Sequence, residues 1–275
     1  MNAIHLVQLT DLHIREPGRL AYGRLDTAPY LRTALDSIAR LRQRPDALVL
    51  TGDLTDFGRE AEYSHLQSLL SALDLPVYLL PGNHDDRAQM RRSFPEHGYL
   101  GDGEFIQYSV DLGPLQLIAL DSVEAGHSAG RLCSQRLAWL ARELERQRDR
   151  PVILAIHHPP FRTLIGHMDR IGLLEGTVEL ERLVAEHGKV QRVICGHLHR
   201  TIYRGFGGTV ASTAPSPAHQ VSLNLSEDAA SSWILEPPGF HIHVWTSDHG
   251  LVTHAAASGQ FEGPFPFRDQ GGLID

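Results

Sequence analysis

Short apolar runs alternate with amphipathic stretches over the first two hundred residues of this chain. The apolar runs are bounded by turn-forming residues, which is typical of buried strands, and they cover residues 4–9, 47–50, 77–80, 152–156 and 190–195. Leucine and isoleucine recur at helical spacing over residues 27–42, 60–73, 134–148 and 178–187. Because strands and helices alternate, we expect an α/β fold built in layers.

The later part of the chain adds antiparallel structure to this pattern. Residues 105–111 and 115–120 alternate apolar and polar positions, and the joint Leu112-Gly113-Pro114 between them indicates a hairpin. Further strands are expected over residues 209–212, 240–245 and 251–256, in a segment rich in Pro, Gly and Ser. We therefore expect two mixed sheets packed together with helices outside. The chain would form one domain, with a core over residues 1–205 and a C-terminal section over residues 206–275 that completes the sandwich.

Bulk properties argue against several classes of partner. The formal net charge is −8 and no run of five basic residues occurs, so a nucleic acid polymer is not an expected partner. No stretch of about 18 apolar residues occurs, so no transmembrane helix is expected. The N-terminus leads directly into a strand, which favours a cytoplasmic location. Cys133 and Cys195 are the two cysteines, and we expect both to be reduced thiols.

Five motifs rich in Asp, His and Asn stand in a fixed order, most of them directly after an expected strand. They are Asp11-Leu12-His13, Gly52-Asp53, Gly82-Asn83-His84-Asp85, His157-His158 and Gly196-His197-Leu198-His199. Taken singly, each motif is more often a turn than a metal site. Taken together, they gather two Asp, one Asn and four His along one edge of a sheet, where open α/β folds place their sites.

These residue types suit a pair of divalent cations. A carboxylate that bridges two cations holds them roughly 3.5–4 Å apart in hydrolytic sites, where they polarise a phosphoryl oxygen and activate water. Mixed nitrogen and oxygen ligands favour Mn, Fe, Zn or Co over Mg or Ca. Two cations with Asp11, Asp53 and one hydroxide keep one net positive charge, which matches a phosphodiester monoanion. A monoester dianion would need more positive charge, for which Arg87 and Arg200 are candidates.

The ordered motif set resembles the calcineurin-like metallophosphoesterase superfamily, and within it the class III cyclic nucleotide phosphodiesterases and the bacterial glycerophosphodiesterases. Surrounding segments extend the resemblance: Ala21-Tyr22-Gly23, Arg44-Pro45-Asp46-Ala47, Leu80-Pro81-Gly82-Asn83-His84-Asp85-Asp86, His157-His158-Pro159-Pro160 and His219-Gln220-Val221. The resemblance implies a four-layer αββα sandwich of two mixed β-sheets flanked by helices. It also implies a phosphoric diester hydrolase that acts on glycerophosphodiesters or cyclic nucleotides through attack of metal-bound hydroxide on phosphorus.

The same resemblance implies a role for each motif residue. The ligands of one cation would be Asp11, His13, Asp53 and His199, and those of the other would be Asp53, Asn83, His157 and His197. Asp53 would bridge the two cations. His84 would not bind metal; it would contact the phosphate or protonate the leaving alkoxide. Expected substrate contacts are Asn83, His84, Tyr22, His127, Ser128 and His219.

Three alternatives and one question of assembly stay open from the sequence. The alternatives are a nuclease of the same superfamily, a phosphomonoesterase, and a non-catalytic scaffold that keeps the fold. Asp56 stands where purple acid phosphatases place a Tyr ligand, and Pro81 stands where Ser/Thr protein phosphatases place Arg, so both classes are disfavoured.

Apolar residues in the C-terminal section, such as Trp233 and Phe261, favour a homo-oligomer, a dimer or larger.

Overall fold

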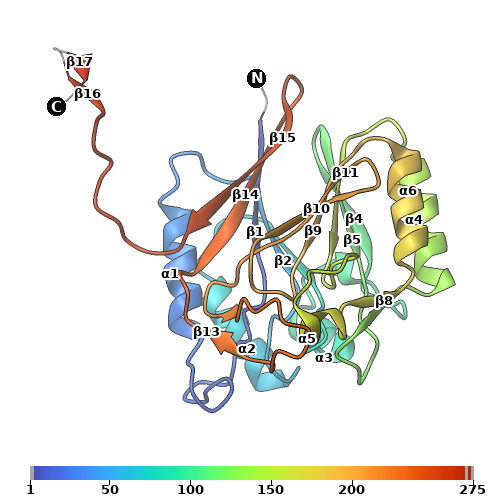
Figure 1. Cartoon of the computed structure of the whole chain (residues 1–275), viewed down its shortest axis with the longest axis horizontal. Coiled ribbons are helices and arrows are strands. Elements are labelled where there is room, and N and C mark those ends of the chain that lie inside the picture. The colour runs from blue at the N-terminus through green and yellow to red at the C-terminus, as the bar shows by residue number, and fades with distance from the viewer. Residues whose placement is uncertain (1–2, 270–271, 274–275) are drawn as a thin grey trace.

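The computed structural model describes residues 3–269 and 272–273, and it shows two large mixed sheets with helices outside (Figure 1). The first sheet has the strand order β15-β14-β1-β2-β3. Its strands are β1 (Ile4–Leu9), β2 (Ala47–Thr51), β3 (Val77–Leu80), β14 (Gly239–Thr246) and β15 (Gly250–Ala257). β1, β2 and β3 run parallel, whereas β14 pairs antiparallel with β1 on one side and with β15 on the other.

The second sheet has the strand order β10-β11-β9-β7-β5-β4. Its strands are β4 (Tyr108–Leu112), β5 (Leu115–Leu120), β7 (Val152–Ile156), β9 (Val190–Cys195), β10 (Ile202–Phe206) and β11 (Thr209–Thr213). β5, β7, β9 and β11 run parallel, and β4 and β10 close the two edges by antiparallel pairing. The expected hairpin over residues 105–120 is present, but its first strand begins only at Tyr108. The N–H of Ile106 donates to the Asp121 carboxylate at 2.9 Å instead of joining the strand ladder.

Five helices cover the outer faces of the two sheets. α1 (Ala28–Ala39), α2 (Glu60–Leu70) and α3 (Arg87–Ser93) contribute Leu31, Leu66 and Met90 to the core of the first sheet. α4 (Ser134–Arg146) and α6 (Thr177–His187) contribute Leu140 and Leu180 to the core on the other side. α1 lies on one side of the molecule, and α4 and α6 lie on the opposite side (Figure 1).

The alternation along β5 shows how the layers are held together. Leu117 and Ala119 are buried in the core shared with the first sheet, whereas Ile118 and Leu120 are buried beneath α4 and α6. Successive side chains of a strand point to opposite faces, so a strand that is apolar at every position must be covered on both faces. The apolar runs therefore specify a central pair of sheets with a helical layer on each side, which confirms the expected αββα sandwich.

Short elements that the sequence pattern did not reveal occur between the main strands and helices and after β15. They are η1 (Gly98–Leu100), β6 (Gly130–Arg131), β8 (Leu173–Glu175), α5 (Gly166–Asp169), β12 (Gln220–Val221), β13 (Trp233–Ile234), β16 (Arg268–Asp269) and β17 (Gly272–Leu273). Each is too short to show a helical or strand period. The described chain beyond Gly259 extends away from the sandwich (Figure 1). Phe261, Phe265 and Phe267 are exposed in this segment. Among the described residues, no helix combines the length and apolar character that crossing a membrane requires.

Candidate metal centre

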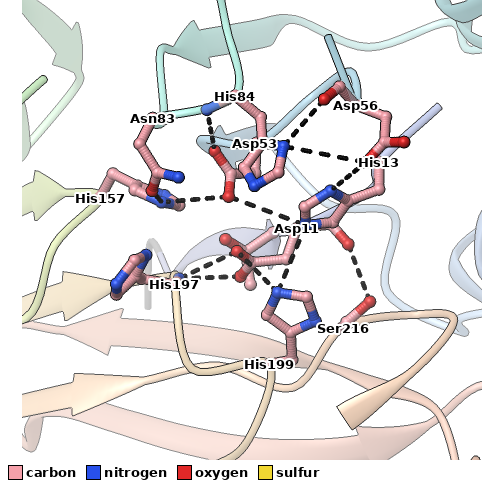
Figure 2. Close-up of polar contacts among 12 residues, drawn as sticks. Asp11, His13, Asp53, Asp56, Asn83, His84, His157, His197, His199 and Ser216 are labelled. Atoms are coloured by element: carbon pink, nitrogen blue, oxygen red, sulfur yellow. Dashed lines mark hydrogen bonds and ion pairs between the residues drawn. The ribbon is translucent and has the colours of Figure 1, made fainter. Parts of the chain in front are cut away.

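The loops that follow β1, β2, β3, β7 and β9 meet at one edge of the sandwich and bring the seven expected metal ligands together (Figure 2). The parallel strands of each sheet end at the same edge, so residues far apart in the chain converge there. Around Asp11, His199 Nε2 lies 3.4 Å from Oδ1. His13 Nε2 lies 3.3 Å from His199 Nε2 and 3.7 Å from Asp53 Oδ2.

A second group of ligand atoms lies on the other side of Asp53. His157 Nε2 is 3.5 Å from Asp53 Oδ2 and 3.2 Å from Asn83 Oδ1. His197 is buried, and its Nε2 has no hydrogen-bond partner among the described residues. Its backbone N–H donates to both oxygens of the Asp11 carboxylate at 3.0 Å, which ties the two halves of the cluster together. Among the described residues, Asp53 is thus the one carboxylate that lies within 4 Å of imidazoles from both groups.

Hydrogen bonds fix the tautomers of three ligand imidazoles. Nδ1 of His157 lies 2.8 Å from the Thr51 carbonyl, and Nδ1 of His199 lies 3.1 Å from the His219 carbonyl. A carbonyl only accepts, so each Nδ1 must carry the proton and each neutral ring keeps a lone pair on Nε2. Nδ1 of His13 lies 3.2 Å from the Asp56 carboxylate, which has the same effect. Partners of this kind orient metal-binding histidines and raise their basicity.

These lone pairs give a direct test of whether the residues fit metal ions. The Nε2 atoms of His13 and His199 face each other at 3.3 Å, and both face carboxylate oxygens. Neutral imidazoles with protonated Nδ1 atoms cannot hydrogen-bond to each other through these nitrogens, so the arrangement needs a proton or a cation between them. The unpaired Nε2 of His197 points to the same requirement. The donor set of imidazole nitrogens, carboxylates and one amide oxygen fits transition-metal cations.

The titration behaviour of the cluster reflects burial opposed by close charges. Burial raises the pKa of Asp11 to about 6, although His157 opposes the shift. Burial also acts on Asp53, but the nearby imidazoles of His157, His84 and His13 outweigh it and hold its pKa well below the usual range. Burial would lower the pKa of His157, yet Asp53 and Asp11 raise it to about 9. Without cations, the cluster therefore holds a proton on His157 that a bound cation would displace.

The backbone at five of the expected ligands adopts conformations that residues other than glycine rarely adopt. Asp11, His13, Asp53, His197 and His199 all have positive φ, between 45° and 69°. Such strain persists only where the surrounding structure fixes it, and it is common at functional sites. Close backbone approach adds a second constraint, because a Cβ at Gly82 would meet His157 Cε1 at 2.8 Å and would overlap Asp53.

Two supporting carboxylates were given no role in the site from the sequence. Asp56 accepts from His13 Nδ1, and its partner Arg15 lies 3.2 Å away. Asp85 accepts from the backbone N–H groups of Gly82 and Leu54, which joins two of the expected ligand loops. Asp85 is the last residue of its motif and Asp56 lies three positions after Asp53, so a search for a carboxylate partner in the same loop is a signal that could have found these roles.

A cavity of about 370 Å³ opens beside the cluster. Of the expected substrate contacts, five line this cavity: Tyr22, Asn83, His84, Ser128 and His219. His127 is exposed and is not part of the lining. Nε2 of His219 lies 3.1 Å from the Tyr22 hydroxyl, which links the first ligand loop to the C-terminal section. Nδ1 of His84 lies 2.8 Å from the Asp56 carbonyl and so carries a proton, which leaves Nε2 as its free nitrogen.

No Lys or Arg is among the described residues that line the cavity. The two arginines considered from the sequence are held elsewhere by carboxylates. Nε of Arg87 lies 2.6 Å from Asp121 Oδ2, and Nη1 of Arg200 lies 2.7 Å from Glu236 Oε2. Neither guanidinium therefore brings uncompensated positive charge to the cluster.

Comparisons with known proteins agree with this geometry. The family profile described as calcineurin-like phosphoesterase matches residues 4–201. The chain is 38% identical to a probable glycerophosphodiester phosphodiesterase of Arcobacter nitrofigilis, over 98% of this chain and 99% of that protein. It is 36% identical to a probable cyclic nucleotide phosphodiesterase of Rhodopseudomonas palustris, over 94% and 93% of the two chains. A dimetal phosphatase from Danio rerio has a similar fold, with a TM-score of 0.63 at 16% identity over 93% and 99% of the chains.

Proposed function

Because the chain belongs to the calcineurin-like phosphoesterase family, we propose that it hydrolyses small phosphodiesters at a centre of two divalent cations. Asp11, His13, Asp53 and His199 would hold one cation; Asp53, Asn83, His157 and His197 would hold the other. When bound, such a pair polarises a phosphoryl oxygen and lowers the pKa of bound water. Mn, Fe, Zn and Co all fit this donor set.

The observation that carries the preference for diesters is the charge of the cavity. Two divalent cations together with Asp11, Asp53 and a hydroxide would carry one net positive charge. No Lys or Arg side chain of the described lining adds to it. A phosphodiester monoanion balances that charge, whereas a monoester dianion would leave an uncompensated negative charge in a poorly solvated site. A phosphomonoesterase is therefore the weaker alternative.

His84 is proposed to handle the proton of the leaving group. Its Nδ1–H is held by the Asp56 carbonyl, and its side chain is part of the cavity lining. The backbone N–H of His84 also donates to Asp53 Oδ1 at 2.9 Å, which keeps the ring beside the proposed bridging carboxylate. Protonated His84 would stabilise negative charge on the phosphoryl group and donate the Nε2 proton to the departing alkoxide.

Two substrate classes follow from the relatives. A glycerophosphodiester is the first candidate, because the relative with that name is similar over nearly the whole of both chains. A 3′,5′- or 2′,3′-cyclic nucleotide is the second candidate, because a relative named as a cyclic nucleotide phosphodiesterase is almost as similar. Both are monoanionic diesters, so the same cation pair serves either.

Assembly and location are further parts of the proposal. Phe261, Phe265 and Phe267 lie exposed on the segment that extends away from the sandwich, and we propose that they pack against another copy in a dimer or larger oligomer. A monomeric mass by light scattering at micromolar concentration would refute this. We also propose that the protein is cytoplasmic, and cell fractionation tests this.

The activity is tested on metal-free protein reconstituted separately with Mn, Co and Zn. Each form is assayed on glycerophosphoethanolamine, 3′,5′-cyclic AMP, 2′,3′-cyclic AMP and a chromogenic diester and monoester pair. We expect metal-dependent turnover that is faster for the diesters than for the monoester. This activity should be lost in Asp53→Ala and kept in Asp102→Ala, which is a matched change at an exposed position. Full activity of Asp53→Ala, or equal turnover with and without metal, would contradict the proposal.

A further inference from the structure

His167 is a buried histidine that lines the same cavity and that the proposed mechanism does not use. Its residue is 7% exposed, and neither ring nitrogen has a hydrogen-bond partner among the described residues. Most buried polar side chains in folded proteins are hydrogen-bonded, and a buried polar group left unpaired destabilises the fold. An unpaired imidazole at the wall of a substrate cavity therefore indicates a partner that arrives with the ligand.

The backbone holds this imidazole in place. His167 lies in α5, and the carboxylate of Asp169 accepts from Thr163 N–H at 2.6 Å and from Leu164 N–H at 3.1 Å, which closes the loop before the helix. A Cβ at Gly166 would meet the Glu227 carbonyl oxygen at 2.5 Å, so the helix lies directly against the C-terminal section.

Packing on the metal-binding loop fixes α5 further. Ile165 and Met168, on either side of His167, belong to a small buried cluster with Leu198 and Val221. Leu198 stands between the expected ligands His197 and His199. The wall that carries His167 is thus tied to the loop that carries the ligands, and its position relative to them is set before any ligand binds.

Apart from the metal cluster, Tyr22 and His219, the cavity lining is apolar with a few hydroxyl groups. Besides His167 it includes Met168, Ile171, Val221 and Trp233, together with Ser128, Ser231 and Ser232. The one carboxylate in the described lining is Asp53, which belongs to the metal cluster. This wall offers hydrogen bonds and apolar surface but no counter-charge, so it suits an uncharged group better than an ammonium group.

We propose that His167 hydrogen-bonds the ester group of the bound diester, meaning the alcohol moiety attached to the phosphate. By this contact His167 would determine which diesters bind well. The inference rests on the proposed function, because the phosphate must lie at the metal cluster for its ester group to reach this wall. The group would be uncharged and would combine hydrogen-bonding atoms with an apolar face. Glycerol hydroxyls and a nucleoside both have this chemistry, and the test separates them.

The test compares His167→Leu, which removes the hydrogen bonds at similar size, with His167→Gln, which keeps a donor and an acceptor. His249→Leu, at an exposed turn, is the matched control. Substrates are glycerophosphoglycerol, 3′,5′-cyclic AMP and methyl phenyl phosphate, whose ester groups have no hydrogen-bonding atoms beyond the phosphate. We expect KM to rise about tenfold for His167→Leu on at least one of the first two, with kcat unchanged and methyl phenyl phosphate unaffected. The substrate that responds identifies the source of the ester group, and His167→Gln should restore much of the loss.

Stability gives a second readout. Because His167 has no partner in the described part of the chain, His167→Leu should not lower the urea midpoint of unfolding, whereas a structural histidine would. Equal kinetics of wild type and His167→Leu on all three substrates, or an equal loss on methyl phenyl phosphate, would overturn the inference. If the wild type hydrolyses none of them, the proposed function fails. The role of His167 is then tested by calorimetric binding of glycerol 3-phosphate and AMP to the metal-loaded wild type and to metal-loaded His167→Leu. Equal affinities of the two proteins for both ligands would overturn that role.

Discussion

The change Gly82→Ala tests how closely the backbone must approach Asp53 at the metal cluster. Gly82 does not have a positive φ, so alanine imposes no backbone strain and the effect of the added methyl is steric. That methyl would overlap the backbone N and Oδ1 of Asp53, and it would meet His157 Cε1 at 2.8 Å. Asp53 and His157, the two residues contacted, are both proposed to hold the cations.

The geometry sets the size of the effect. Restoring ordinary contact would displace Asp53 by about 1 Å, and a displacement of that size at a reacting centre costs on the order of 100-fold in rate. Metal–ligand distances tolerate only about 0.2 Å, so the affinity for cations should also fall. Overpacking of a buried site costs a further ~1–3 kcal/mol of stability.

Three measurements separate these effects. They are turnover of a chromogenic diester at saturating Mn, titration of the metal-free protein with Mn, and urea unfolding. Gly205→Ala is the control, because nothing lies within 4 Å of its added methyl and its φ is not positive. If Gly82→Ala matched Gly205→Ala in turnover and metal affinity, the close packing of Gly82 on Asp53 would not matter for function, and the reasoning would be refuted.

Three further outcomes are expected. Asp56→Asn weakens the partner of His13 Nδ1, so cation affinity should fall about 10–100-fold in a metal titration; unchanged affinity would contradict this. Since the pKa of His157 is raised to about 9, cation binding at pH 7 should release a proton and tighten as pH rises towards 9; calorimetry in two buffers of different ionisation enthalpy checks this, and identical heats would count against it. Burial lowers the pKa of His241 from 6.5 to about 4, so the unfolded state binds the proton more tightly, and stability is lost as pH falls through this window. His241→Leu should therefore lose on the order of 2 kcal/mol less than wild type between pH 7 and pH 4.5 in urea unfolding; an equal loss would refute the assignment.

The layered fold could be predicted because its signal is local. The apolar run of β1 and the helical spacing in α1 lie within single short segments; β1 has the expected bounds, and α1 lies within the expected residues 27–42 but ends at Ala39. Boundaries were less accurate. The expected helix over residues 60–73 ends at Leu70, and a turn follows in which Leu73 N–H donates to the Leu70 carbonyl. The strand expected from residue 105 begins at Tyr108, because the N–H of Ile106 is bonded to the Asp121 carboxylate outside the segment.

The candidate site divides in the same way. The expected ligands follow strand ends, and parallel strands of one sheet end at one edge, so their meeting could be anticipated from order alone. The wall opposite could not be anticipated from the residue pattern: Tyr22 and His219 were expected there only through the family resemblance, and Trp233 was not expected there. The ring centroids of Trp233, His219 and Tyr22 lie 5.1–5.6 Å apart, yet Tyr22 and His219 are 197 positions apart in the chain. No local period connects such residues.

The sequence by itself determined the layers of the fold and the chemical type of the donor groups, because strand period, helix spacing and side-chain chemistry are properties of short segments. Tertiary structure alone decided which nitrogen of each imidazole is free, that Arg87 and Arg200 are neutralised by carboxylates, and that His167 faces the cavity unpaired. Those properties depend on hydrogen-bond and ion-pair partners that the folded backbone brings from distant parts of the chain, and a one-dimensional pattern does not contain them.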